Sequence, residues 1–176
     1  MKQGSAFYTS LDNKMVYLLL GSNLGDSAAL LEEAIEAIAK RIGTLSRRSA
    51  VYETQAWGKE DQPNFLNQAI AVETNLSPLE VLEQALWIEK ELGRVRLERW
   101  GARLIDIDVI LYGNEVVDIE DKLQVPHPQM QNRRFVLEPL AEIAGAALHP
   151  ILNQTISEIL LNLNDTLEVS KTKYNT

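Results

Sequence analysis

The sequence predicts an α+β fold in which helices pack against an antiparallel sheet. Short apolar runs bounded by turn residues alternate with two segments of helical periodicity, and the second of these segments opens with a capping box. The expected elements therefore follow in the order β-α-β-β-α-β. This is the split β-α-β order of ferredoxin-like folds, which carry their helices on one face of the sheet and leave the other face open for a functional site.

The first half of this pattern lies before residue 65. Residues 15–21 form an apolar run that ends at a glycine, which is typical of a buried strand. Residues 26–42 place apolar side chains at the spacing of one helix face, which predicts an amphipathic helix. Residues 45–54 are expected to form a more polar strand, and residues 55–64 contain the Gly, Pro and Asp of a loop.

The second half repeats the strand and helix signals. Residues 65–74 alternate as a strand does, and residues 77–80, Ser-Pro-Leu-Glu, form a capping box with proline at the first helical position. Residues 104–112, LIDIDVILY, predict the last strand of the sheet. Residues 133–144 and 154–163 predict two further helices.

Composition limits the classes of function. The chain has 176 residues, and we expect one domain over residues 15–176 after an unstructured extension at residues 1–14. A net charge of −8 argues against binding to nucleic acid or to a membrane surface, because phosphate-rich partners attract an excess of Lys and Arg. We find no apolar run of membrane-spanning length and no signal peptide, and therefore expect a cytoplasmic protein. We also expect it to be a monomer.

The residue types also limit the kind of metal site. The sequence contains no cysteine and two histidines, which argues against thiolate and multi-histidine sites. If the protein binds a metal ion, we therefore expect a hard cation held by oxygen ligands.

The strand at 104–112 carries the most informative pattern. Because side chains alternate between faces, Asp106 and Asp108 point the same way, with Cα atoms about 7 Å apart. The expected apolar face, turned to the helices, consists of Ile105, Ile107, Val109 and Leu111. The other face consists of Leu104, Asp106, Asp108, Ile110 and Tyr112. Two like charges on one strand face repel, and bound Mg²⁺ would remove this cost while also binding substrate phosphates. The simpler alternative is a solvated polar strand face.

A basic segment precedes this strand. Residues 93–103, GRVRLERWGAR, carry four arginines and one glutamate inside an acidic protein, which indicates a small polyanionic ligand. Arginine also suits phosphate oxygens geometrically, because its guanidinium group can donate two parallel hydrogen bonds. A solvated basic loop is the alternative reading. Trp100 in this segment either anchors the packing or closes over a substrate.

A second group of residues suits a flat heteroaromatic ligand. Phe65 and Asn67 share one strand face, and Thr54, Gln55 and Trp57 come from the segment just before it. An aromatic ring can stack on such a ligand while an amide binds its edge. In the alternative reading, Phe65 belongs to the core and Asn67 to the surface.

Two polar residues outside these groups have less specific signals. His127, between two prolines in VPHP, is either a phosphate or ribose contact or only a turn residue. Asn23, in GSNLGD, is expected to cap the first helix rather than to bind a ligand.

Four ordered motifs resemble one enzyme family. They are LLLGSNLGD at 18–26, YETQAWGKEDQPNFLNQAI at 52–70, LGRVRLERWGARLIDIDVILYG at 92–113 and VPHPQMQNRRFVLEPLAEIA at 125–144. Together they resemble the 6-hydroxymethyl-7,8-dihydropterin pyrophosphokinases of folate biosynthesis. This resemblance implies a ferredoxin-like fold and transfer of pyrophosphate from ATP to the hydroxymethyl group of the pterin, with release of AMP. It also implies Mg²⁺, as two ions bound with ATP.

The resemblance further implies roles for individual residues. Asp106 and Asp108 match the magnesium ligands and, with Arg94 and Arg103 of the basic segment, the catalytic residues. The implied pterin-binding residues are Thr54, Gln55, Trp57, Phe65, Asn67, Trp100 and Phe135. The implied ATP-binding residues are Glu89, Arg94, Arg96, Trp100, Arg103, Val109, His127 and Arg133.

Two other classes of protein fit parts of the pattern. An RNA-binding module shares the β-α-β-β-α-β order, but it would need stacking aromatic residues on the open face and a basic charge balance. A metal-dependent sugar-nucleotide transferase could use the Asp-x-Asp pair, but we would expect it to need a larger nucleotide-binding domain. A binding assay with a nucleotide sugar would identify the second class.

Overall fold

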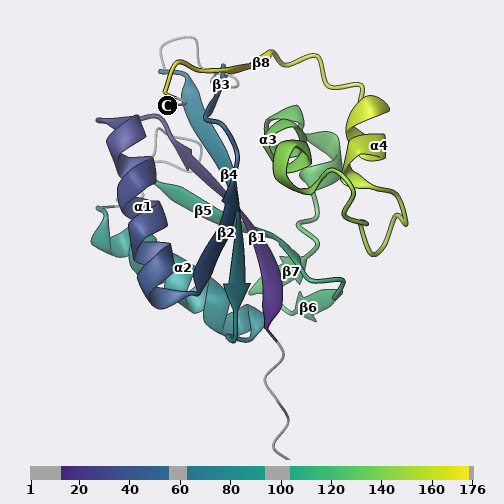
Figure 1. Cartoon of the computed structure of the whole chain (residues 1–176), viewed down its shortest axis with the longest axis horizontal. Helices are drawn as coiled ribbons and strands as arrows, with labels where there is room; N and C mark the ends of the chain where they lie inside the picture. The colour runs from purple at the N-terminus through teal and green to yellow at the C-terminus, as the bar shows by residue number, and fades with distance from the viewer. Residues whose placement is uncertain (1–12, 56–62, 94–103, 175–176) are drawn as a thin grey trace, which may run out of the picture.

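An antiparallel sheet lies between two pairs of helices (Figure 1). The computed structural model describes residues 13–55, 63–93 and 104–174. The main sheet contains β1 (Lys14–Ser22), β2 (Thr44–Arg48), β3 (Tyr52–Thr54), β4 (Phe65–Thr74), β5 (Asp106–Tyr112) and β8 (Val169–Lys171). A separate hairpin contains β6 (Val117–Ile119) and β7 (Leu123–Val125). The helices are α1 (Ser27–Arg41), α2 (Pro78–Glu91), α3 (Arg134–Ala144), α4 (Ile156–Leu161) and the 3₁₀ turn η1 (Met130–Asn132).

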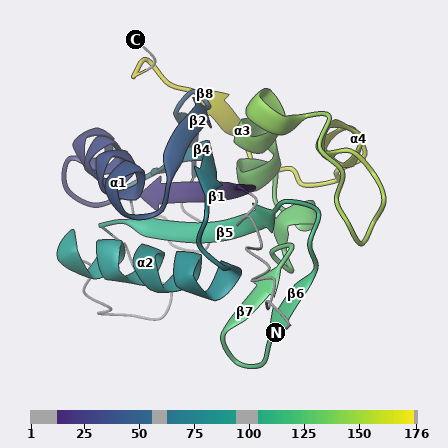
Figure 2. The ribbon, with the colours of Figure 1, turned by 60° about the horizontal axis from the view of Figure 1, so that its bottom comes forward.

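The strand order places β1 and β4 at the centre of the sheet. It runs β5-β1-β4-β3-β8, and β2 pairs with β4 as a branch from this path. Each of these pairs is antiparallel. Within the described residues, β5 is therefore an edge strand that lies next to α2, as Figure 2 shows.

Most of the expected elements are present. The strand predicted at 65–74 coincides with β4, and the capping box opens α2 through both of its reciprocal hydrogen bonds. In that box Glu80 N donates to Ser77 Oγ at 3.2 Å, and Ser77 N donates to Glu80 Oε2 at 2.7 Å. The helices predicted at 133–144 and 154–163 correspond to α3 and to the shorter α4.

The strand predicted at 45–54 is interrupted. It forms β2 and β3, and the buried Ser49 lies between them. Ser49 N donates to Ala69 O at 2.9 Å, while Ser49 Oγ accepts from Ala69 N at 3.0 Å. A side-chain oxygen therefore satisfies the β4 donor that a backbone carbonyl would satisfy in a continuous strand, and regular pairing with β4 resumes at Tyr52.

Helices cover both faces of the sheet. The helices α1 and α2 share one face, as expected, whereas α3 and α4 lie on the face that was expected to be open. One core lies between the sheet and the helices α1 and α2, and includes Leu18, Leu20, Leu31, Ile38, Ile70, Ile88 and Ile105. A second core lies under α3 and α4 and includes Leu19, Ala69, Ile110, Leu111, Leu137 and Leu140. The second face is therefore apolar and covered where α3 packs on β4 and β1.

A β-bulge reverses the predicted faces at the end of β5. The β1–β5 register shifts between Tyr17, which pairs with Leu111, and Leu18, which pairs with Val109. Ile110 is thus the extra residue, and two consecutive side chains enter the second core. Leu111 was predicted on the face of α1 and α2 but lies in the second core. Tyr112 was predicted on the opposite face but lies in the first core.

The remaining elements were not expected from the sequence. They are the β6–β7 hairpin and β8, which are short strands without a strong apolar pattern. The extension predicted at residues 1–14 lies outside the described residues up to residue 12. Its last residue, Lys14, is the first residue of β1. In the described part of the chain, no helix has the length and apolar character needed to cross a membrane.

Candidate functional site

The two aspartates of β5 point toward the α3 side of the sheet. Asp106 and Asp108 are half-buried and alternate with the buried Ile107, as predicted from the strand period. Asp108 pairs with Leu19, whose side chain belongs to the second core, and opposed residues of an antiparallel pair share a face. The pair precedes the bulge, so the reversal at the end of β5 does not change its direction.

The buried Glu89 binds the backbone between these aspartates. It lies near the end of α2 with 2% of its surface exposed, and its Oε2 accepts from Ile107 N at 2.9 Å. Because β5 is an edge strand in the described sheet, this N–H has no strand partner on that side. Glu89, expected to contact ATP, thus has a structural contact that ties α2 to the carboxylate strand.

A second polar group lies on the same face of the sheet, on β3 and β4. Asn67 is 5% exposed and Thr54 is 4% exposed, and Asn67 Nδ2 donates to Thr54 Oγ1 at 3.4 Å. Thr54 pairs with Phe65, which is half-buried at the start of β4. The alternative reading in which Asn67 is a surface residue is wrong, because the amide is buried.

The strand register joins the two groups in one row. Gly21 of β1 pairs with Asp106 on one side and with Asn67 on the other. Strands lie about 4.8 Å apart, so the Cα atoms of Asp106 and Asn67 are separated by about 10 Å across two strand spacings. The carboxylate and the amide therefore lie on one face with only a glycine between them.

A third group approaches from the loop after β7. His127 N donates to Ile110 O at 2.9 Å, and His127 Nδ1 accepts from Gln129 N at 3.1 Å, so a neutral ring carries its proton on Nε2. Burial lowers the pKa of His127; the positive charge of Arg133 lowers it further, and the negative charge of Asp106 opposes both effects. His127 thus lies within electrostatic reach of Arg133 and Asp106.

Arg133 also contacts the expected pterin-binding residue Phe135. The guanidinium carbon lies 5.7 Å from the centre of the Phe135 ring, a cation–π distance. Phe135 is the second residue of α3 and packs against the second core. The start of α3 therefore brings a cation and an aromatic ring toward the face that carries the aspartates.

The other expected site residues are distributed differently. Trp57, Arg94, Arg96, Trp100 and Arg103 lie outside the described residues. Gln55 is exposed directly after β3. The side chain of Val109 is buried in the first core, so a contact from this residue to ATP would have to come from its backbone.

Asn23 has a different role from the predicted one. The cap of α1 is Asp26, whose Oδ1 accepts from Ala29 N at 3.1 Å, because Asp26 directly precedes the helix. Asn23 is 2% exposed, and its Nδ2 donates to Pro63 O at 3.1 Å. It therefore ties the end of β1 to the segment that leads into β4. Sequence reasoning missed this contact because nothing local marks its partner.

The donor set of the aspartate pair fits magnesium. Carboxylate oxygens are hard ligands, and Mg²⁺ is commonly held by one or two carboxylates together with substrate phosphates. Within residues 13–55, 63–93 and 104–174, no group of three or more His, Asp or Glu side chains forms a metal cluster. A metal ion at Asp106 and Asp108 could also bind substrate phosphates.

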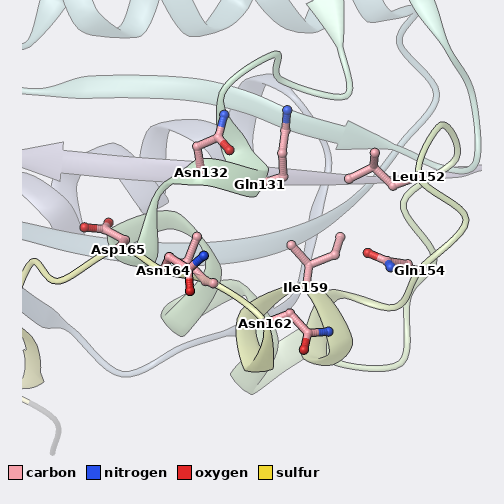
Figure 3. A pocket seen from close by; sticks show the side chains of 9 residues that line it. Gln131, Asn132, Leu152, Gln154, Ile159, Asn162, Asn164 and Asp165 are labelled. Atoms are coloured by element: carbon pink, nitrogen blue, oxygen red, sulfur yellow. The ribbon is translucent and has the colours of Figure 1, made fainter.

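Two cavities between described residues lie away from the Asp106–Gly21–Asn67 row. One of about 530 Å³ is lined by side chains of η1, of α4 and of the segments on both sides of α4, among them Gln131, Asn132, Gln154, Asn162 and Asp165 (Figure 3). Another, of about 1050 Å³, lies between the start of α1 and the β2–β3 junction. Neither is lined by a residue of the Asp106–Gly21–Asn67 row, so the candidate site rests on the strand register.

Comparison with known proteins identifies the family. The family described as 7,8-dihydro-6-hydroxymethylpterin-pyrophosphokinase (HPPK) matches residues 17–145. The chain belongs to this family. It is therefore a pyrophosphokinase of folate biosynthesis, an enzyme that acts on small molecules, as the sequence motifs implied. This assignment sets aside the RNA-binding and sugar-nucleotide alternatives.

Several curated members of the HPPK family are similar over most of their length. A 2-amino-4-hydroxy-6-hydroxymethyldihydropteridine pyrophosphokinase of Haemophilus influenzae is 43% identical over 150 residues, which cover 85% of this chain and 92% of the relative. The protein of the same name from Methylorubrum extorquens is 49% identical over 150 residues, 84% of this chain and 92% of the relative.

Solved structures support the fold. A Plasmodium falciparum HPPK-DHPS chain superposes with a TM-score of 0.70 at 17% identity, covering 85% of this chain and 43% of that chain. At this identity the likeness concerns the fold alone. The chain spans less than half the length of that HPPK-DHPS protein, and the matched part has the same mixed arrangement of helices and antiparallel sheet.

Proposed function

We propose that the HPPK reaction takes place on the α3 side of the sheet, along the Asp106–Gly21–Asn67 row. The observation that supports this most directly is the pairing of Gly21 with both Asp106 and Asn67. It brings a carboxylate pair suited to a metal–phosphate group and a buried amide suited to a ring edge onto one face. Their separation of about 10 Å, two strand spacings, leaves room for the reacting groups of ATP and the pterin.

Asp106 and Asp108 would hold Mg²⁺, as two ions bound with ATP. When bound, magnesium neutralises charge on the transferred phosphates, which is its usual contribution to phosphoryl transfer. The half-buried position of both aspartates on an edge strand supports this role, since the site can be reached and is partly shielded from water. The contact from Glu89 to Ile107 N would fix the spacing of the pair.

Histidine and arginine side chains would hold the polyphosphate of ATP. His127 lies within electrostatic reach of both Arg133 and Asp106, and we propose that His127 and Arg133 bind phosphate oxygens or the nucleoside. Arg94, Arg96 and Arg103 would donate hydrogen bonds to the phosphates from the basic segment. Glu89 and the backbone of Val109 remain proposed ATP contacts, and Trp100 would close over both substrates.

The pterin would lie at β3 and β4. Asn67 Oδ1 can accept from N–H groups at the edge of the pterin, because its Nδ2 is directed to Thr54. Phe65 and Phe135 are proposed to pack on the two faces of the ring, and Gln55 and Trp57 would complete the pocket.

In the proposed reaction, the hydroxymethyl oxygen of the pterin attacks the β-phosphorus of ATP. The bond from the β-phosphorus to the oxygen bridging to the α-phosphate breaks, AMP leaves with that oxygen, and the hydroxyl proton is released. The residues of the chain act mainly by orientation and charge, as in other phosphoryl transfers.

Several broader features also belong to this proposal. The strand order β5-β1-β4-β3 supports a ferredoxin-like βαββαβ core, to which α3, α4 and the later strands are added. We propose one domain over residues 15–176, preceded by an extension at residues 1–14. We also propose a cytoplasmic monomer, and the acidic net charge of −8 supports a protein that does not bind nucleic acid or membranes.

The direct test is nucleotide analysis after incubation with ATP and Mg²⁺, with and without 6-hydroxymethyl-7,8-dihydropterin. AMP that forms only when the pterin is present would support the proposal, because it requires attack at the β-phosphorus. ADP in its place would show transfer of a single phosphoryl group and would contradict it. The absence of cleavage by folded protein would contradict it as well.

A further inference from the structure

Gly21 is a buried glycine inside a central strand, which calls for a physical explanation. A glycine in a strand weakens it, because the unfolded chain loses more freedom and no side chain packs on the neighbours. Such a glycine commonly marks a positive φ, a bulge, the close approach of another backbone, or the close approach of a ligand. The structure allows these causes to be separated.

The backbone gives no reason for the glycine. Among the described glycines, positive φ occurs at Gly25, Gly93 and Gly113, and Gly21 is not one of them. The bulge of the β1–β5 pair lies between Tyr17 and Leu18, near the middle of β1 and away from Gly21. The β1–β4 register is continuous through Gly21.

Packing against another backbone gives no reason either. A Cβ at Gly21 would meet two atoms of the described residues within 4 Å, and the backbone one is Leu66 O at 3.9 Å, an ordinary contact. The tight contact is with Asn67 Oδ1 at 3.0 Å. The amide oxygen of the proposed pterin site therefore leans over Gly21, toward the strand that carries Asp106.

We propose that Gly21 is a positioning residue for the reaction. Its missing side chain keeps the Asn67 amide in place and leaves a passage between Asn67 and Asp106, through which the hydroxymethyl group of the pterin reaches the phosphates. This inference rests on the proposed function. Any larger residue would occupy the point where the two substrates must meet.

The test compares two substitutions of the same kind. Gly21→Ala adds a methyl group in the row, whereas Gly113→Ala adds one at the other end of β5, where φ is +53° and the nearest atom is Lys14 Cδ at 3.9 Å. For both variants we would measure kcat and KM for the pterin, the Kd of a non-hydrolysable ATP analogue in the presence of Mg²⁺, and the Tm.

The two variants should show opposite patterns. We expect Gly21→Ala to lower kcat/KM for the pterin at least tenfold, with the nucleotide Kd within twofold and the Tm not lowered. Gly113→Ala should lower the Tm through backbone strain and leave kcat/KM for the pterin within twofold.

Three results would overturn the inference. One is a Gly21→Ala enzyme with wild-type kinetics for the pterin. Another is a Gly21→Ala protein that fails to fold, or that loses as much affinity for the nucleotide as it loses kcat/KM for the pterin. Either result would make the glycine a packing residue. The third is wild-type protein without pterin-dependent AMP release. Of the three results, only this one would also refute the proposed function.

Discussion

Glu89 accepts a hydrogen bond from Ile107 N at 2.9 Å, and that N–H lies between the two aspartates of the candidate magnesium site. A carboxylate on a helix thereby replaces the neighbouring strand that an edge strand lacks. The spacing of Asp106 and Asp108 thus depends on Glu89, which is separated from them in the sequence by the end of α2 and the segment between α2 and β5.

Removal of this acceptor should destabilise the protein. Glu89→Ala leaves a buried N–H without its partner, which typically costs about 1–3 kcal/mol, and we expect a lower urea midpoint and a higher Mg²⁺ requirement. Glu89→Gln keeps an acceptor oxygen and should lose less stability. Equal urea midpoints for wild type and Glu89→Ala would show that the contact contributes little.

Asp108→Ala should abolish turnover and preserve the fold. The substitution removes one of two proposed metal ligands from a half-buried position that is outside both cores. Turnover would be measured as pterin-dependent AMP release, and folding by circular dichroism. Asp118→Ala, at an exposed aspartate of β6, is the matched control and should keep full activity. Full activity of Asp108→Ala would remove this residue from the metal site.

Asn67→Ala should weaken binding of the pterin selectively. The loss of a buried acceptor for the ring edge corresponds to about 1.5–3 kcal/mol, roughly a 10- to 150-fold rise in the pterin KM, with the ATP KM nearly unchanged. Asn64→Ala is the control, because Asn64 is exposed and its Nδ2 donates to Glu53 Oε1 at 3.2 Å. If both substrates were affected equally, the assignment of Asn67 to the pterin would be wrong.

The stability of the fold should depend on pH through His149. Burial lowers the pKa of His149, and its Nδ1 accepts from Ile151 N at 3.2 Å and Leu152 N at 3.1 Å. The unfolded state therefore binds a proton at a higher pH than the folded state does. The stability contribution is complete above the ordinary histidine pKa of about 6.5 and is lost as the pH falls below it.

This pH dependence can be measured by thermal unfolding between about pH 5 and 8, a range centred on the histidine pKa. The wild-type Tm should fall on the acid side, and His149→Gln, which does not titrate there, should show a flatter profile. Parallel profiles for the two proteins would show that other groups cause the acid loss.

Local signals predicted the elements whose causes are local. The capping box at Ser77 and Glu80 satisfies helix N–H groups within one turn, and the alternation of side chains along β5 matches the structure from Asp106 to Val109. The direction of Asp106 and Asp108 followed from the same alternation. These features depend on residues that are neighbours in the sequence, so their physical cause is visible there.

Features caused by distant partners were not predictable in this way. The bulge at Ile110 exists because β1 and β5 must fit against each other, and β2 ends where Ser49 meets Ala69. The pairing of Gly21 with Asn67 and Asp106 requires the strand order. Asn23 was assigned to a helix cap because its actual partner, Pro63 O, lies far along the chain.

The pairing of β3 with β8 has a consequence for biosynthesis. The short strand that ends in Thr54 is held by β4 on one side and by Val169–Lys171 on the other, and Thr172 N also donates to Val51 O at 2.9 Å. A nascent chain can pack α1 and α2 onto β1, β4 and β5 before β8 leaves the ribosome. We therefore expect the edge of the proposed pterin pocket to acquire its final support only after residues 169–171 have emerged from the ribosome.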